Sequence, residues 1–240
     1  MTSTVFSSSL LHYSASRNST PPRHFGRRYG SDGLFLPEPG NTVVCHLVED
    51  SESQRAVIEA RQKLLDMPQV SQFAFTPISS LHMTLFQGII EDRRALPYWP
   101  ADIALDTTID RMTDLFQERL RTFAALGPFN VEAIEVTPAG LTVAGATQKD
   151  RRVMKEWRDA LAGFFGYRHP DHDTYVFHIT FAYPIRWLDD AVLPAWQDEL
   201  DKALGGLRRK APIIALRPPA FCVFEDMNHF AERLVLTADW

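Results

Sequence analysis

Two short stretches of the sequence place a histidine and a threonine two residues apart in an apolar frame. They are His82 and Thr84 in residues 81–86 (LHMTLF), and His178 and Thr180 in residues 177–182 (FHITFA). Apolar and polar residues alternate in both stretches, which is typical of a strand with one buried face. Alternation puts each histidine on the same face as its threonine, where an imidazole and a hydroxyl can both bind a phosphate. The two stretches together therefore predict a phosphate site built from two strands.

The tripeptide His-x-Ser/Thr is a weak signal by itself. It also occurs at His12-Tyr13-Ser14 and His172-Asp173-Thr174, where no alternating apolar frame surrounds it. Either framed copy alone is better explained as a half-buried strand that exposes two polar residues. The hypothesis of a site depends on the matched pair.

Length and composition are those of a globular protein. The 240 residues suffice for one large domain or two closely joined lobes, and 45% are hydrophobic and 23% charged. A net charge of −5 argues against non-specific binding of long nucleic acid. Cys45 and Cys222 lie in apolar runs and are expected to be buried thiols rather than a disulfide. No apolar run approaches the roughly 20 residues that span a bilayer, and the N-terminus does not resemble a signal peptide, so we expect a cytoplasmic protein.

The chain divides into an N-terminal arm, residues 1–40, and a single domain, residues 41–240. The arm is rich in Ser, Thr, Arg, Pro and Gly and is expected to be irregular. Arg23, Arg27 and Arg28 make it locally basic. It is either a solvated tail or a lid that brings an arginine to an anionic ligand.

Periodic patterns in the domain predict an alternation of strands and helices. Strands are expected at 41–48, 73–76, 81–86, 129–137, 141–146, 177–182, 213–216, 220–224 and 233–237. Helices are expected at 52–65, from a cap at Asp106–Thr107 to Leu126, at 148–165 and at 188–204.

The order strand, helix, histidine strand occurs over residues 41–86 and again over 141–182, with the two histidines 96 residues apart. This duplication predicts an α+β fold. We expect two pseudo-symmetric lobes, interleaved in sequence, whose antiparallel sheets face a central cleft with helices outside.

Paired His-x-Thr strands in a duplicated α+β chain resemble the two-histidine (2H) phosphoesterase superfamily, which includes the 2′,3′-cyclic phosphodiesterases once called 2′-5′ RNA ligases. The resemblance extends from about Asn41 to the C-terminus. It implies that His82 and His178 are the catalytic pair and that Thr84 and Thr180 bind the phosphate. The arm and the connection at 91–107 match no well-known member, so the resemblance does not carry over a substrate.

The chemistry of such a site follows from its side chains. To open a cyclic phosphodiester, water must lose a proton and the departing alkoxide must gain one. Two imidazoles with ordinary pKa values of about 6.5 can divide these tasks near neutral pH, which gives a bell-shaped pH dependence without a metal or cofactor. We expect a monomer acting on a cyclic phosphate or a 2′-5′-linked nucleotide or RNA end, with no membrane or long duplex DNA as partner. Either histidine can be the acid.

Four further residues are candidates for substrate binding, with core packing as the alternative for each. Tyr183 and Gln87 follow the two histidine motifs, and His46 lies on the first predicted strand. Phe224 lies near a C-terminal turn, where it or His229 could stack on a base.

Two other classes of function remain open. The run 169–173 (HPDHD) holds imidazoles and carboxylates that suit a transition metal, although its spacing matches no known motif. A metal-dependent hydrolase could be built on it. The second alternative is a non-catalytic nucleotide- or RNA-binding module. The sequence contains no glycine-rich phosphate loop and no serine nucleophile elbow.

Overall fold

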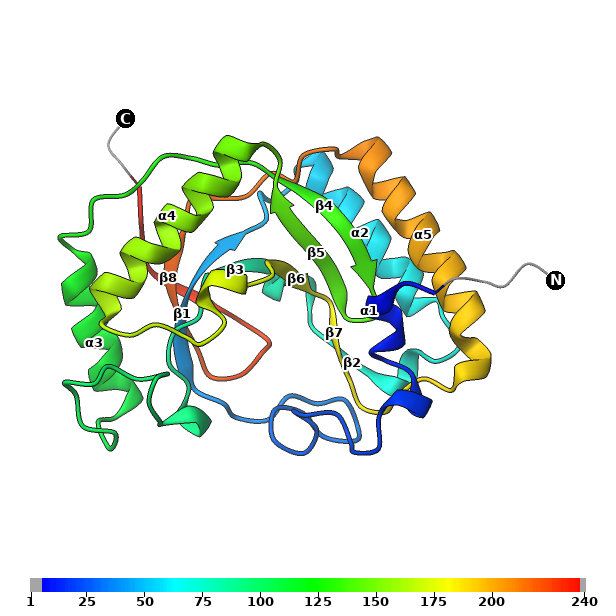
Figure 1. Ribbon diagram of the computed structural model, residues 1–240, viewed down its shortest axis with the longest axis horizontal. Coiled ribbons are helices and arrows are strands. Elements are labelled where there is room, and N and C mark those ends of the chain that lie inside the picture. The colour runs from blue at the N-terminus through cyan, green and yellow to red at the C-terminus, as the bar shows by residue number, and fades with distance from the viewer. Residues whose placement is uncertain (1–5, 238–240) are drawn as a thin grey trace.

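The computed structural model describes residues 6–237, in which helices alternate with strands (Figure 1). The helices are α1 (Ser8–Leu11), α2 (Glu52–Leu65), α3 (Ile109–Leu120), α4 (Gln148–Phe165) and α5 (Leu193–Lys210). The strands are β1 (Gly40–His46), β2 (Phe73–Phe75), β3 (His82–Phe86), β4 (Val131–Thr137), β5 (Gly140–Gly145), β6 (His178–Thr180), β7 (Ala182–Pro184), β8 (Ala220–Phe224) and β9 (Ala231–Val235). The predicted α+β class is confirmed.

The strands form a seven-stranded antiparallel sheet of order β4-β5-β6-β3-β1-β8-β9 and a two-stranded sheet of β2 and β7. The prediction gave each half of the chain its own sheet. Instead, the two histidine strands β3 and β6 pair with each other and join the strands of both halves. The histidine strands are therefore neighbours in the middle of one sheet.

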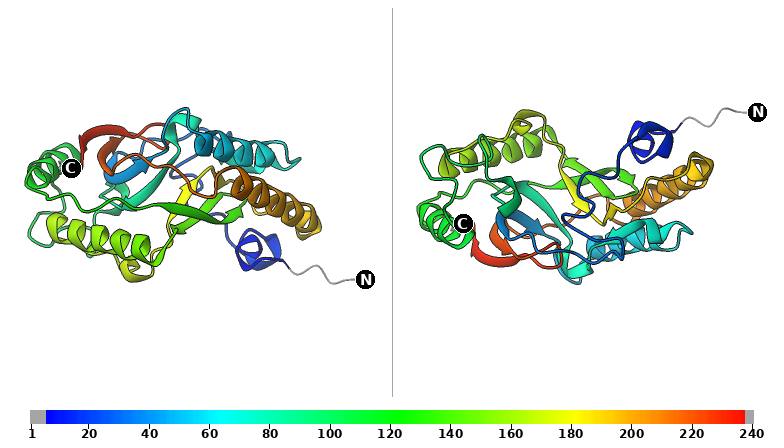
Figure 2. Two further views of the ribbon diagram at one scale, coloured as in Figure 1. Left: turned by 90° about the horizontal axis from the view of Figure 1, so that it is seen from above. Right: turned by 90° about the horizontal axis from the view of Figure 1, so that it is seen from below.

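The helices lie in two groups at opposite ends of the molecule. Helix α4 packs on β3 and β5 with α3 beside it, and α5 packs on β4 with α2 beside it (Figures 1 and 2). Large apolar side chains fill the core between helices and sheet, among them Trp157 and Trp196, each at most 1% exposed.

Local capping explains why two helices occur where the sequence predicts them. Ser51 caps α2 by accepting a hydrogen bond from the Gln54 amide. Thr147 and Asp150 form a reciprocal capping box at the start of α4. Gly166, with φ of 80°, ends α4 in the left-handed conformation that glycine adopts without strain.

Two predicted helices have different bounds. Helix α3 is capped by Thr108 and ends at Leu120, because the chain then turns so that Phe123 stacks on Trp157 of α4. Helix α5 begins at Leu193 rather than 188, with Pro194 in its first turn, where a missing N–H costs little. It continues past Leu204 because Leu207, 2% exposed, packs into the core.

Several predicted strands also have different bounds; the last, for example, is β9 at Ala231–Val235 rather than 233–237. Residues 213–216 make only two isolated bridges, Leu47 with Leu216 and Val131 with Ile214. The second histidine strand is shorter than expected because the chain changes sheets after Thr180. The amides of Phe181 and Ala182 both donate to the Ala139 carbonyl, and β7 then pairs with β2.

The described part of the N-terminal arm, residues 6–39, packs against the rest of the protein. Beyond α1 it is largely irregular, and side chains tie it down at several points. The Tyr29 hydroxyl donates to the Pro184 carbonyl at 2.7 Å, and the Trp187 indole donates to the Thr20 carbonyl at 2.6 Å. The arm thereby contributes side chains to the wall of the cavity described below, and in Figure 1 it crosses the lower part of the view.

Two further expectations concern cysteines and membranes. Cys45 and Cys222 are both free and buried, as predicted. Among residues 6–237, no helix has the length and apolar character needed to cross a bilayer.

Candidate active site

The pairing of β3 with β6 brings the two histidines and two threonines onto one patch of the sheet. Met83 lies opposite Ile179, and both side chains are fully buried on the core face. Continuing this antiparallel register places His82 opposite Thr180 and Thr84 opposite His178, all on the other face. The two histidines are then diagonal neighbours, a relation that typically separates backbone positions by about 7–8 Å. A phosphate group fits between side chains that extend from two such positions.

Each imidazole is oriented by the same backbone contact. Nδ1 of His82 lies 2.7 Å from the Ser80 carbonyl, and Nδ1 of His178 lies 3.0 Å from the Val176 carbonyl. A carbonyl oxygen can only accept, so Nδ1 carries the proton in both rings. In the neutral imidazole, Nε2 is consequently the atom that can take up a proton. The two halves of the site repeat this contact at the same spacing along the chain.

The two histidines differ in their surroundings. His82 is half-buried, with the Phe230 ring 4.1 Å away between centroids, whereas His178 is exposed. Burial, with smaller contributions from the positive charges that His46 and His178 can carry, lowers the pKa of His82 to about 3. His82 is therefore a neutral imidazole across the physiological range.

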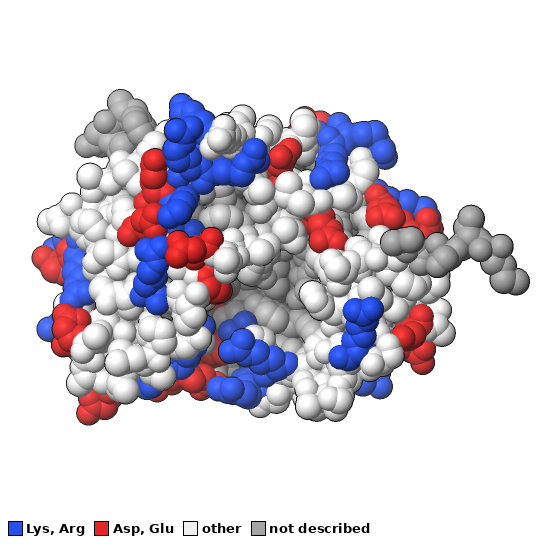
Figure 3. Space-filling view, in the orientation of Figure 1, with Lys and Arg blue, Asp and Glu red and all other residues white. Residues whose placement is uncertain are grey.

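All four motif residues line one cavity of about 630 Å³, visible as a hollow in Figure 3. This volume lies within the range typical of small-molecule sites. The hydroxyls of Thr84 and Thr180 make no hydrogen bond to another group within the described residues, so both can bind a ligand oxygen. A second cavity of about 480 Å³, with Tyr13 and Trp187 in its wall, shares His178 and Thr180 with the first.

Three of the four predicted substrate-binding residues line the main cavity: Tyr183, Gln87 and Phe224. Tyr183 is held in place by the arm, because Tyr29 stacks on its ring at 5.5 Å and the Arg28 guanidinium lies over it at 5.2 Å. Its position follows from the change of sheets after Thr180, which puts it on β7 rather than on the histidine strand.

The prediction that His46 binds substrate is not supported by its position. His46 pairs with His82 across β1 and β3, but it does not line the cavity. Its Nδ1 lies 3.2 Å from a carboxylate oxygen of Glu232 on β9. The ring therefore packs beside His82 and is turned toward an acidic side chain. His229 does not line the cavity either, and it is Phe230 that contacts His82.

Several residues of the cavity were missed from the sequence. Arg93 lies in the long connection at 91–107, where its guanidinium lies over the Tyr98 ring, and Tyr98 in turn packs against His169. The arm contributes His24, which was not expected, together with Arg23, Arg27 and Arg28, the arginines considered in the lid alternative. The basic composition of the arm was the one available signal, since nothing local in the sequence shows that residues 23–28 and 93 meet.

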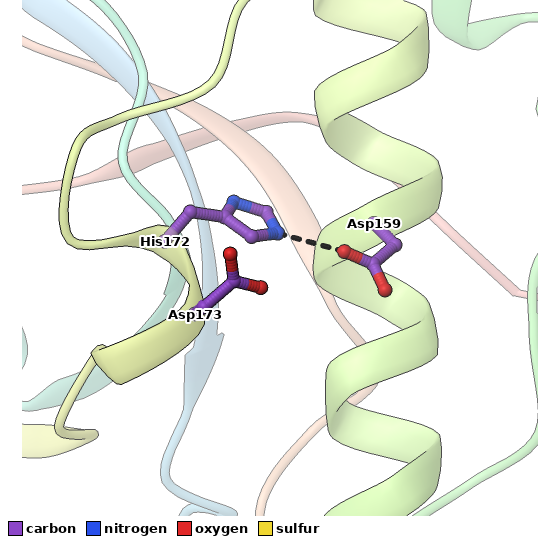
Figure 4. Close-up of side chains that lie close together, drawn as sticks. All are labelled: Asp159, His172 and Asp173. Atoms are coloured by element: carbon purple, nitrogen blue, oxygen red, sulfur yellow. Dashed lines mark hydrogen bonds and ion pairs between the residues drawn. The ribbon is translucent and has the colours of Figure 1, made fainter.

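The loop considered for metal binding separates its two histidines. His169 faces the main cavity, whereas Nε2 of His172 lies 2.9 Å from a carboxylate oxygen of Asp159 on α4, with Asp173 nearby (Figure 4). These three residues could approach one metal ion. However, Lys155 and Arg168 already pair with both carboxylates, at 2.6–3.8 Å. A metal ion would have to displace two cations, so the donor set fits a salt-bridge cluster better.

One family model and one solved structure show what this chain is similar to. The family model described as "2H-phosphodiest: Domain of unknown function (DUF1868)" matches residues 28–142, a segment that contains the first motif. The chain is also similar to a conserved protein of unknown function from Agrobacterium tumefaciens strain C58, whose crystal structure is known. The two are 55% identical, the match covers 96% of this chain and 100% of the other, and the TM-score is 0.95. No curated protein matches.

The structure thus brings one histidine–threonine pair from each of two adjoining strands to one cavity. This chain belongs to the 2H phosphoesterase family. That membership suggests phosphoesterase activity.

Proposed function

We propose that the protein is a metal-independent phosphodiesterase that acts on a cyclic phosphate or a 2′-5′-linked nucleotide or RNA end. The observation that carries the proposal is the matched pair of imidazoles. Both have Nδ1 bound to the carbonyl two residues earlier, and both line one cavity with a threonine hydroxyl beside them. A protein that only bound its ligand would not need two acid–base groups oriented alike.

In this proposal His82 is the general base and His178 the general acid. The Nδ1 proton of His82 is bound to the Ser80 carbonyl, which leaves the Nε2 lone pair free to accept a proton from the attacking water. His178 lies at the exposed edge of the same cavity, and in its protonated form it protonates the departing alkoxide through Nε2. Nε2 of His82 gains a proton and Nε2 of His178 loses one. The scissile P–O bond breaks as the P–O bond to the attacking water oxygen forms.

The threonines act on the charge of the reacting phosphate. The hydroxyls of Thr84 and Thr180 donate hydrogen bonds to the non-bridging oxygens, whose charge shifts in the transition state. The register places each hydroxyl opposite a histidine, so one phosphate can contact all four side chains.

We further propose that the domain, residues 41–240, consists of two pseudo-symmetric halves that meet at the β3–β6 pair, with the cleft between them. The repeated strand–helix–strand order and the repeated carbonyl contact of each histidine support this view. The arm then acts as a lid, which is supported by the three arginines that it adds to the cavity.

Turnover of nucleoside 2′,3′-cyclic phosphates tests the proposal. His82→Ala and His178→Ala should each lower turnover by about 10²–10⁴-fold, the usual contribution of a general acid or base. The control is His229→Ala, because His229 is exposed and lines neither cavity. Full activity in both single variants would refute the assignment, and binding without product formation in the wild type would favour the non-catalytic alternative.

A further inference from the structure

The main cavity has a group of arginines that is only partly neutralised. Arg28 pairs with Glu38 at 2.6 Å, and Arg27 pairs with Asp92 at 3.6 Å. Arg23 and Arg93 also line the cavity, and neither has an ion-pair partner among residues 6–237. Figure 3 shows basic side chains gathered along the lower rim of the hollow, where the arm passes in Figure 1.

Arg93 is held in place without a counter-charge. It is half-buried, its guanidinium stacks on the Tyr98 ring at 4.6 Å, and its Nε is buried without a hydrogen-bond partner. Burial lowers the pKa of Arg93, and the nearby Arg28 and Arg23 add repulsion. A fold tolerates such a cluster of like charges most readily where a ligand brings the opposite charge.

His169 provides a second, independent sign of a ligand. It is only 5% exposed, it packs edge-on against Tyr98 at 5.0 Å, and it lines the same cavity. Its Nε2 is buried without a hydrogen-bond partner. Burial and the charge of Arg93 lower the pKa of His169 to about 4, so the ring is neutral and still able to donate or accept one hydrogen bond. A buried polar atom of this kind normally has a partner.

We infer that Arg93, His169 and Arg23 form a second anion subsite in the cavity, so that the substrate carries a further phosphate or similar anionic group besides the scissile phosphodiester. This inference rests on the proposed function for what occurs at His82 and His178. The subsite is carried by the 87–108 connection, the loop before β6 and the arm, and none of its residues belongs to the histidine strands. A cavity of about 630 Å³ has room for a nucleotide with two phosphates.

Isothermal titration calorimetry with two matched nucleotides tests the subsite without requiring turnover. The probes are adenosine 2′-monophosphate and adenosine 2′,5′-bisphosphate, which differ only in the second phosphate. The wild-type protein should bind the bisphosphate about tenfold or more tightly, as charge-assisted hydrogen bonds allow. Arg93→Gln should abolish most of this preference and leave the affinity for the monophosphate unchanged.

Two further variants complete the experiment. Arg23→Gln changes an exposed arm residue, so it should fold normally and reduce the same preference even if Arg93→Gln is unstable. Arg152→Gln removes one positive charge from an exposed position of α4 outside both cavities and should leave the preference unchanged.

Equal affinity of the wild type for the two probes, or no binding of the bisphosphate, would overturn the inference. So would an equal loss of affinity for both probes in Arg93→Gln, since Arg93 would then bind the scissile phosphate. The proposed function fails separately, if the histidine variants keep full turnover while the bisphosphate preference still depends on Arg93.

Discussion

Replacing His82 by glutamine should reduce the loss of stability that the wild-type protein undergoes on acidification. Burial lowers the pKa of His82 to about 3 in the folded protein, whereas the unfolded chain has the ordinary value of about 6.5. Between these values the unfolded state binds more protons. The contribution of His82 to stability is therefore complete above about pH 6.5 and is lost as the pH falls toward 3.

The size of this effect follows from the two pKa values. Each pH unit inside the window costs up to about 1.4 kcal/mol, so the change from about pH 7 to about pH 5 should cost up to about 2 kcal/mol. The glutamine side chain cannot take up this proton. The His82→Gln protein should therefore lose less stability than the wild type over the same pH interval, and the difference should be that amount. His24 and His169 also have lowered pKa values, and their contributions are the same in both proteins.

Urea-induced unfolding at about pH 7 and about pH 5 measures both proteins. The compared quantity is the drop in the free energy of unfolding between the two pH values. His229→Gln is the control, because it removes an exposed histidine from the β8–β9 turn, next to the Phe230 ring that contacts His82, and its drop should equal that of the wild type. An equal drop in His82→Gln would show that burial does not lower the pKa of His82 in the folded protein, and this reading of its surroundings would be wrong.

Three other changes have defined outcomes. A Cβ on Gly140, where φ is 147°, would lie 2.1 Å from the Ile179 carbonyl oxygen of β6. Gly140→Ala should therefore lower the free energy of unfolding in urea by on the order of 1–3 kcal/mol and lower turnover. Gly163→Ala, with open space around it, is the control, and equal stability of the two variants would argue against the close approach. Thr84→Val or Thr180→Val should lower kcat by about 10²-fold with little change in KM, as for loss of one transition-state donor; a change in KM alone would assign them to ground-state binding. Asp159→Asn and EDTA should both leave turnover unchanged, and a loss restored by a divalent cation would favour the metal-dependent alternative.

Local signals in the sequence predict much of the secondary structure. Residues 52–65 and 148–165 are helical as expected because Ser51, Thr147 and Gly166 fix their ends through contacts within a few residues. The predicted bounds are wrong where a contact between residues far apart in the sequence sets the end of an element. Helix α3 is an example, because Phe123 lies beyond its end and stacks on Trp157 of α4.

The site could be predicted only in its central part. Alternation shows that His82 and Thr84 share a face, and the same holds for His178 and Thr180, but only the sheet shows that β3 and β6 are neighbours. The residues that adjust the site come from elsewhere in the chain. Phe230 covers His82, and Arg93 supplies charge to the cavity. Neither residue lies at a fixed spacing from a histidine motif, so only the tertiary structure shows that they belong to the site.

The central claim is that His82 and His178 act together on one phosphate. A crystal structure with adenosine 2′-monophosphate bound tests it most directly. The account predicts that the phosphate lies between the two imidazoles, with both Nε2 atoms and both threonine hydroxyls within hydrogen-bond distance of its oxygens. A phosphate that contacts only one histidine, or that binds away from β3 and β6, would contradict it.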